Sequence, residues 1–340
     1  ATAYHLAKKQ GIRNVAVLEK GYLGGGNSGR NTQVTRSNYF WPQSAAFFDH
    51  SLKLYEQLSQ ELNFNVMLSQ RGVLSLCNSQ HELEIYRRWS NAIGMNGIDS
   101  EMLSRAEIRR LAPYLNLDCR YPVSGGFLQK RAGISRHDAV VWGYARQAAA
   151  AGVDIIQQCE VTGMETSDSR LTALRTSRGT IQANRVALCV AGHSSQLAAM
   201  AGLRLPITSI ALQAMVTEPV RPIFDTTLMS AQIHVYLSQS DRGELVIGGG
   251  ADLYNSYAQR GSLQTWTETL SALLELFPLF GRLRLMRQWA GICDMAYDVS
   301  PIVGKTELEN LYISTGWGTG GYKAIPAGGD TLAQTIAQDR

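Results

Sequence analysis

The segment Val15-Ala16-Val17-Leu18-Glu19 decides the fold class of this chain. Its four consecutive apolar residues predict a buried parallel strand, which ends at the acidic residue. The strand follows residues 1–10, which are good helix formers, and Gly11, which predicts the end of that helix. A helix, a turn and a buried strand in this order indicate an α/β protein.

Glu19 has two interpretations. In a dinucleotide-binding βαβ unit, an acidic residue at the end of the second strand accepts hydrogen bonds from the adenosine ribose hydroxyls. Such a unit begins with a strand and a GxGxxG turn, so we expect the chain to be N-terminally truncated, with these parts upstream of Ala1. The alternative is an exposed acid at the end of an ordinary parallel strand.

Length and composition restrict the class of protein. A chain of 340 residues, 45% hydrophobic and 18% charged, predicts a soluble globular protein with two domains or one large interleaved unit. A formal net charge of +4, scattered along the chain, gives little support for nucleic-acid binding. No stretch approaches the roughly 18 apolar residues of a membrane helix. The five cysteines form no CxxC pair, which disfavours a metal site and favours the cytoplasm.

Hydrophobic periodicity divides the rest of the chain. The predicted helices span residues 45–62, 79–92, 104–111 and 265–277. Ser104 is the expected N-cap of the third of these helices. The predicted strands span residues 153–156, 185–190, 211–217, 234–238, 245–248 and 311–315. Those between residues 205 and 285 are expected to be antiparallel, which indicates an inserted second domain.

Glycine-rich segments stand where ligand-binding loops occur. Residues 21–32 are too flexible for a helix and too long for a simple turn. Residues 316–323, Gly-Trp-Gly-Thr-Gly-Gly-Tyr-Lys, join the strand 311–315 to the final helix. Residues 191–195 follow the strand 185–190 in a similar way. A strand that enters a small-residue turn and then a helix is typical of a ligand-binding site.

The order of these pieces resembles the D-amino-acid oxidase and sarcosine oxidase family of flavoproteins. The resemblance rests on residues 15–19, 24–36, 186–192 and 316–323, and it covers nearly the whole chain. It implies an α/β (α+β) fold with a glutathione-reductase-type FAD-binding domain, N-terminally truncated, at residues 1–40, 130–204 and 286–340. It also implies an inserted antiparallel-sheet substrate domain at residues 41–129 and 205–285.

Three further stretches are similar to one branch of that family, the β subunits of heterotetrameric sarcosine oxidases. These stretches are residues 29–39, 131–138 and 287–293. The similarity implies oxidation of sarcosine to glycine, with hydrogen peroxide formed from oxygen and a one-carbon unit passed to tetrahydrofolate. It further implies α, γ and δ partner subunits, noncovalent FAD and covalent FMN.

The resemblance also implies FAD contacts along the whole chain. The residues it assigns to FAD are Glu19, Asn27, Ser28, Arg30, Asn31, Thr32, Val161, Gly318, Gly321 and Lys323. Lys323 lies near the predicted start of the final helix, where backbone amides and the helix dipole can meet the flavin pyrimidine carbonyl. By residue type alone, a solvated lysine in a glycine-rich turn is an equally good interpretation.

Arg36, Lys323 and Tyr236 are the predicted catalytic residues. In monomeric sarcosine oxidases two basic side chains hold the substrate carboxylate, and Arg36 and Lys323 match their positions. A planar guanidinium suits this task because it binds a carboxylate in bidentate fashion. Tyr236 belongs to the domain that forms the roof over the substrate in the family. Without the resemblance, Arg36 is a solvated arginine and Tyr236 a strand-packing residue.

His137 follows Arg136 and precedes Asp138 at a predicted helix start. By residue type alone it is a capping or surface histidine. The resemblance implies instead that a ring nitrogen of His137 is bonded to the 8α carbon of FMN. It also implies that Arg136, and with it Arg287, neutralises the FMN phosphate.

Two positions depart from the monomeric members of the family. Where those members have a lysine over the flavin that promotes oxygen reduction, this chain has the apolar strand 245–247. The missing charge implies that oxygen reacts elsewhere, in agreement with electrons that leave FAD for FMN. Cys293 aligns near the cysteine that binds FAD covalently in those members, but here we expect a buried structural thiol.

Two other functions remain open. A related FAD-dependent amino-acid dehydrogenase or opine oxidase would reduce a quinone or another protein in place of oxygen. A non-catalytic subunit would use the same fold for assembly alone. Flavin absorbance and the identity of the electron acceptor separate these possibilities.

Overall fold

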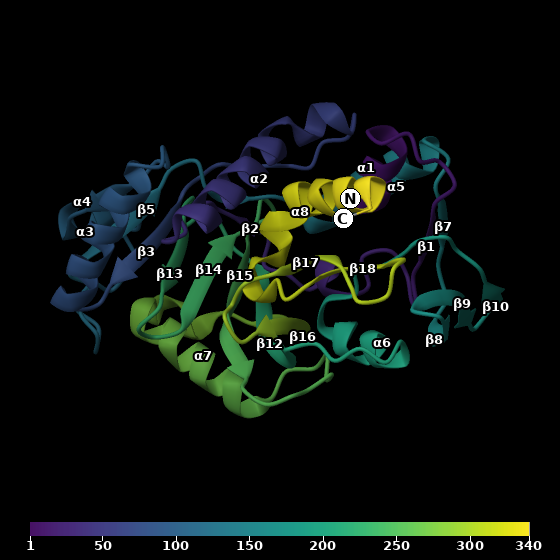
Figure 1. Cartoon of the computed structure of the whole chain (residues 1–340). Coiled ribbons are helices and arrows are strands. Elements are labelled where there is room, and N and C mark those ends of the chain that lie inside the picture. Colours follow the sequence, from purple (N-terminus) through teal and green to yellow (C-terminus); the bar gives the residue numbers. More distant parts are fainter. Residues whose placement is uncertain (340) are drawn as a thin grey trace.

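The computed structural model describes residues 1–339, in which a layer of helices lies beside the strands (Figure 1). Helices α1 (Thr2–Lys8), α2 (Pro42–Glu61), α5 (His137–Ala150) and α8 (Gly321–Gln338) form this layer. They pack around a shared apolar core that includes the buried rings of Tyr4, Tyr55 and Tyr144. None of the helices in residues 1–339 combines the length and the apolar character that a bilayer crossing needs.

Two small groups of parallel strands lie next to this layer. β1 (Ala16–Leu18) pairs in parallel with β7 (Asp154–Ile156). β11 (Val186–Leu188) pairs in parallel with β18 (Leu311–Thr315), and β17 (Ile302–Lys305) joins β18 in antiparallel orientation. The strands predicted from apolar runs in these regions are therefore confirmed.

An eight-stranded mixed sheet forms the largest element of the fold. Its strand order is β16-β12-β15-β14-β13-β3-β5-β4. The strands are β3 (Val73–Cys77), β4 (Glu101–Leu103), β5 (Gly125–Gln129), β12 (Ile207–Pro219), β13 (Thr227–Ser230), β14 (Val235–Gln239), β15 (Glu244–Asp252) and β16 (Leu285–Ala296). All neighbouring pairs are antiparallel except β13 and β3, which confirms the antiparallel pairing expected between residues 205 and 285.

Besides four short 3-10 helices, four α-helices and five strands remain in residues 1–339. They are α3 (Gln80–Gly94), α4 (Arg105–Leu111), α6 (Ser194–Met200), α7 (Leu263–Leu276), β2 (Val34–Thr35), β6 (Gly133–Ile134), β8 (Val161–Ser167), β9 (Arg170–Thr176) and β10 (Gly179–Ile181). Ser104 caps α4, and Glu107 completes a capping box. These bonds confirm the helix start predicted at Ser104. The sequence can predict such a start because a cap depends only on residues within one turn.

The long edge strand β16 lies at the domain boundary that the resemblance implies. The resemblance places residues 286–296 in the FAD-binding segments, and these residues pair with β12 over nearly its whole length. Continuous backbone hydrogen bonding makes β16 part of the eight-stranded sheet. We propose that the boundary of the substrate domain lies after Ala296.

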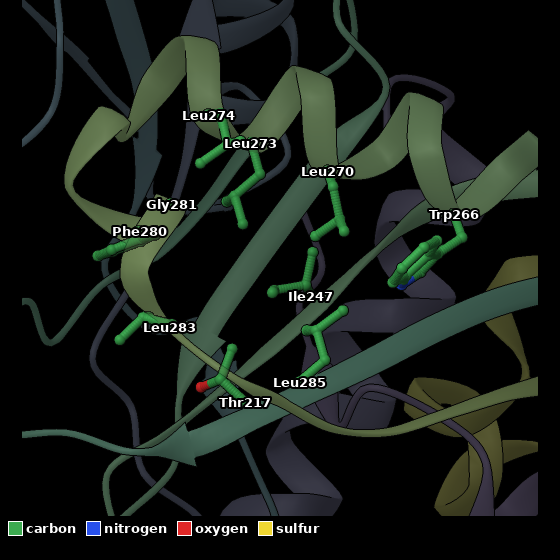
Figure 2. A pocket seen from close by; sticks show the side chains of 10 residues that line it. All are labelled: Thr217, Ile247, Trp266, Leu270, Leu273, Leu274, Phe280, Gly281, Leu283 and Leu285. Atoms are coloured by element: carbon green, nitrogen blue, oxygen red, sulfur yellow. The ribbon is translucent and has the colours of Figure 1, made fainter. Parts of the chain in front are cut away.

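The two faces of this sheet have different neighbours. One face carries Met215 and Ile247 of the main core and packs against Leu273 of α7. A cavity of about 310 Å³ lies there, with a lining that is apolar except for Thr217 (Figure 2). The opposite face carries Tyr236, which meets Thr32 in the segment that precedes β2.

Candidate active site

The glycine-rich loop of residues 21–32 is fastened to β16. The side-chain amide of Asn27 accepts a hydrogen bond from the Ile292 N–H at 2.9 Å and donates one to the Ile292 carbonyl at 2.5 Å. The indole N–H of Trp289 donates to the Arg30 carbonyl at 2.7 Å. These bonds connect the loop, which we expect to bind a ligand, directly to the eight-stranded sheet.

Other polar side chains of the loop shape the loop itself. Asn31 donates to the Ser28 carbonyl and accepts from the Gln33 N–H at 2.7 Å. The Arg30 guanidinium donates to the Gly25 carbonyl. Because these side chains form hydrogen bonds within the loop, a ligand would be bound mainly by the backbone groups of the loop. The FAD contacts predicted for this loop remain predictions.

Tyr236 lies on the sheet face next to this loop. The Thr32 hydroxyl donates to the Tyr236 hydroxyl at 3.2 Å. The Tyr236 ring crosses Gly248 of β15, where an added Cβ would lie 2.3 Å from the ring and the hydroxyl. Gly248 therefore provides the space that Tyr236 occupies. Burial raises the pKa of Tyr236, so its phenol is neutral at pH 7.

Two cationic side chains from opposite ends of the chain meet at Tyr39. The Arg36 guanidinium donates to the Asn38 side chain at 2.6 Å, and its Cζ atom lies 4.6 Å from the centroid of the Tyr39 ring. Lys323 stands in the first turn of α8 with only 8% of the residue exposed. Its ammonium donates to the Thr319 carbonyl at 2.9 Å.

The electrostatics of this cluster favour an anionic ligand. Burial lowers the pKa of Lys323, while Tyr39 opposes this shift and Arg36 adds to it. Burial raises the pKa of Tyr39, but Lys323 and Arg36 outweigh it, so the pKa of Tyr39 falls below its ordinary value. An added carboxylate would stabilise both cations, because opposite charges at short range favour the charged forms.

Tyr39 is a residue of this cluster that the sequence analysis does not single out. Its ring stacks on Phe48 of α2, with 4.0 Å between the ring centroids. In the sequence, only its position three residues after Arg36, in the stretch 29–39, indicates that Tyr39 could belong to the site. An aromatic residue at that spacing predicts core packing equally well, so the sequence could not assign it to the site.

A buried carboxylate supports the glycine-rich turn before α8. Asp294 of β16 is 2% exposed and accepts hydrogen bonds from the Gly316 N–H at 2.7 Å and the Thr315 hydroxyl at 3.1 Å. The Trp317 N–H lies 3.3 Å from the same oxygen. Burial raises the pKa of Asp294 in spite of these donors. Asp294 thereby ties the edge strand of the sheet to the turn, a connection that the sequence analysis misses.

Glycine is required at two positions of this turn. Gly316 has φ of 74° and Gly318 has φ of 50°, values that other residues adopt only with strain. Gly321 follows as the first residue of α8. The FAD contacts predicted for Gly318 and Gly321 therefore fall in one turn that presents backbone groups at a helix N-terminus.

Replacing Asp294 by alanine is expected to lower the free energy of unfolding by about 3 kcal/mol, because buried donors lose a charged acceptor. A urea titration of the FAD-loaded protein measures this change. Exposed Asp298, replaced by alanine, is the control. A loss below about 1 kcal/mol for Asp294→Ala would show that the turn does not depend on this carboxylate.

His137 is the first residue of α5 and is partly buried. Its Nδ1 atom lies 2.9 Å from Nε2 of Gln33, a residue with φ of 69°. Burial lowers the pKa of His137; Asp138 opposes this shift and Arg136 adds to it. The imidazole is therefore mainly neutral at pH 7 and has a nitrogen lone pair available for bond formation.

The two arginines predicted to meet an FMN phosphate have different surroundings. Arg136 forms a bidentate contact with Asp138, at 3.1 and 2.7 Å, which raises the pKa of the guanidinium. Arg287 is exposed on β16, opposite Val216 of β12. Among the hydrogen bonds and ion pairs of residues 1–339, none joins Arg287 to His137 or Arg136. The shared phosphate contact remains a prediction.

A hydrogen-bonded path connects the Lys323 cluster to the His137 segment. The hydroxyl of Tyr322 donates to the Ser135 carbonyl at 2.8 Å. The Tyr55 hydroxyl of α2 donates to the Tyr322 carbonyl at 2.7 Å. Because Tyr322 and Lys323 are adjacent, α8 contacts both the Lys323 cluster and the segment before His137.

The structure brings Glu19 close to the segment before Val161. The Glu19 carboxylate accepts from the Gly21 N–H at 2.8 Å, and its carbonyl accepts from the Cys159 N–H at 2.9 Å. Val161 begins β8 two residues further on.

Cys293 is buried, and burial raises the pKa of its thiol to about 12. The buried thiol expected at this position is confirmed.

Known proteins are similar in sequence to this chain over nearly its whole length. The sequence profile of the FAD dependent oxidoreductase (DAO) family matches residues 1–335. A sarcosine oxidase subunit beta of Rhodobacter capsulatus is 51% identical over 339 residues, which are 99% of this chain and 82% of that protein. A sarcosine oxidase subunit beta of an Arthrobacter species is 51% identical over 341 residues, which are 100% of this chain and 84% of that protein.

A solved structure supports the same fold. The L-proline dehydrogenase of P. horikoshii superposes with a TM-score of 0.92 at 23% identity, covering 99% of this chain and 90% of that one. The predicted fold class and the predicted family resemblance are confirmed. This chain belongs to the FAD dependent oxidoreductase family.

Proposed function

We propose that this chain is the flavin-binding β subunit of a heterotetrameric sarcosine oxidase and oxidises the N-methyl group of sarcosine. The convergence of Arg36 and Lys323 beside Tyr39 carries the proposal. Two cations at one partly enclosed site suit a small amino acid with a single carboxylate. The relatives named sarcosine oxidase subunit beta support this choice of substrate.

The residues present fit a noncovalently bound FAD. Glu19 stands at the end of β1, where an acid suits ribose hydroxyls, and the turn at Gly318 presents backbone groups at the start of α8. The loop with Asn27, Ser28, Arg30, Asn31 and Thr32 lies over the same sheet face as Tyr236. FAD supplies the two-electron oxidation of the substrate, and the protein orients the substrate and tunes the charge around it.

The chain's own groups act on the substrate through charge and position. Arg36 and Lys323 would bind the carboxylate, and Tyr236 with Thr32 would lie on the sheet side of the substrate. Sarcosine reacts as the free amine, and loss of a hydride equivalent from its N-methyl carbon gives an imine. Transfer of that carbon to tetrahydrofolate, or to water in its absence, then releases glycine.

His137 would carry FMN through a covalent bond from a ring nitrogen, with Arg136 and Arg287 at the phosphate. The neutral imidazole at a helix start supports this assignment. Oxygen would then be reduced to hydrogen peroxide at that second flavin. The strand 245–247 of β15 carries apolar Val246 and no positive charge. This supports a site for oxygen away from FAD, because a positive charge near the flavin promotes oxygen reduction.

The complex would contain α, γ and δ subunits in the cytoplasm. Co-expression with these partners and assay with sarcosine tests the proposal. We expect one glycine and one hydrogen peroxide for each sarcosine consumed, together with flavin absorbance of the purified complex. Reduction of a dye without peroxide would favour the amino-acid or opine dehydrogenase alternative. Absence of both flavin and activity would leave a non-catalytic assembly subunit.

A further inference from the structure

We infer that Tyr39 is a positioning residue that holds Arg36 and Lys323 as one carboxylate-binding site. The inference rests on the proposed function, because it concerns the two cations that would bind the substrate carboxylate. It adds a residue whose own contribution is to fix and charge the other two.

The Tyr39 ring is held between two groups. Phe48 stacks on it with 4.0 Å between centroids and 16° between the ring planes. The Arg36 guanidinium lies 4.6 Å from the same centroid. Since a parallel ring at that distance fills one face of Tyr39, the guanidinium lies over the other face. A cation over an aromatic face is attracted by the ring quadrupole, which fixes the position of Arg36.

The Tyr39 hydroxyl points to the start of α8. An added Cβ at Gly320 would lie 3.7 Å from this hydroxyl, which places it next to the turn that carries Lys323. The ammonium of Lys323 has three N–H donors, of which the Thr319 carbonyl accepts one. The nearby Tyr39 hydroxyl opposes the fall that burial causes in the pKa of Lys323. N–H donors of the ammonium therefore remain for a ligand.

Tyr39 also offsets the free-energy cost of placing two cations close together and burying one of them. Arg36 and Lys323 repel one another, and Lys323 is largely removed from water. A hydroxyl oxygen close to the ammonium and a π face under the guanidinium both attract positive charge. Tyr39 therefore opposes the fall that burial causes in the pKa of Lys323.

The backbone around Tyr39 is fixed without the help of its hydroxyl. Gln129 of β5 is fully buried, and its side-chain oxygen accepts from the Ser37 N–H at 2.9 Å and the Asn38 N–H at 3.1 Å. A Tyr39→Phe variant keeps both this anchor and the ring stacking. It is therefore expected to fold and to lose only the hydroxyl contact.

The test uses the assembled, FAD-loaded complex and methoxyacetate as the probe. Methoxyacetate has the carboxylate of sarcosine with an ether oxygen in place of the amine, so it is not oxidised as an amine. Its binding is followed by the change in flavin absorbance from about pH 6 to about pH 10, a range chosen to cover loss of the ammonium proton. Methoxyacetamide, which lacks the charge, is the comparison ligand, and Tyr297→Phe, at an 84% exposed tyrosine, is the control variant.

We expect Tyr39→Phe to raise the Kd of methoxyacetate about tenfold near pH 7, through loss of one charge-assisted hydrogen bond. Binding should also fail at a lower pH than in the wild type. Binding needs protonated Lys323, and removal of the Tyr39 oxygen lowers the pKa of Lys323 further. The variant therefore loses the ammonium proton, and with it the ligand, at a lower pH. For sarcosine, KM should rise while kcat changes little.

A Tyr39→Leu variant removes the ring as well and should raise the Kd about 100-fold. If this variant does not fold, Tyr39→Phe alone decides the test. Wild-type Kd and wild-type pH dependence in Tyr39→Phe would overturn the inference while leaving the carboxylate site intact. If Arg36→Met and Lys323→Met also bind methoxyacetate as the wild type does, the proposed carboxylate site fails together with it.

Discussion

Replacing Lys323 by methionine is expected to lower kcat/KM for sarcosine about 100-fold in the assembled enzyme. The buried ammonium would supply a charge-assisted hydrogen bond to the substrate carboxylate, and loss of such a bond costs about 1.5–3 kcal/mol. Methionine fills a similar volume and removes the buried charge, so the start of α8 should keep its shape. Steady-state kinetics over a range of sarcosine concentrations measures the effect.

Lys130→Met is the matched control for this prediction. Lys130 has 70% of its side chain exposed and forms an ion pair with Glu101 at the surface. Its loss should leave kcat/KM within about twofold, because exposed ion pairs contribute little. A Lys323→Met enzyme with nearly wild-type kcat/KM would refute the role of this lysine in carboxylate binding.

Replacing His137 by asparagine is expected to abolish acid-stable flavin on this polypeptide. The imidazole nitrogen would be the atom bonded to FMN, and an amide nitrogen has no available lone pair of comparable basicity. Noncovalent FAD should remain, because Glu19 and the turn before α8 are unchanged. The measurement is flavin absorbance after acid denaturation, followed by the mass of the peptide that contains residue 137.

His50→Asn, at an exposed position of α2, controls for the substitution itself and should keep the covalent flavin. Peroxide formation should fall strongly in His137→Asn while sarcosine still bleaches the FAD absorbance. Covalent flavin that persists in His137→Asn would place the bond on another residue. A wild-type chain that carries no covalent flavin would end the heterotetrameric assignment and leave a simpler FAD dehydrogenase.

Local patterns in the sequence were sufficient for the elements of the fold. The apolar run at residues 15–18 predicts β1, and the periodicity of residues 45–62 predicts α2 to within a few residues. Ser104 predicts the start of α4 because its side chain bonds within the first turn. These features depend on neighbours in the chain, so no tertiary information is needed to find them.

The family order of motifs placed Arg36, Lys323 and His137 among the candidate residues, and the structure adds what surrounds each of them. It brings Arg36 and Lys323 to Tyr39, joins His137 to Gln33 and ties Asp294 to the turn before α8. It also moves residues 286–296 into the eight-stranded sheet.

The secondary-structure elements, their order and the chemical types of the candidate residues thus follow from the amino-acid sequence. Which of these side chains lie together, and which groups support them, follows from tertiary packing. Helix and strand signals repeat over a few residues, whereas the approach of Tyr39 to Lys323 depends on how α8 packs against α2 and the sheet. That packing is set by burial of apolar surface over the whole chain, and no short segment contains it.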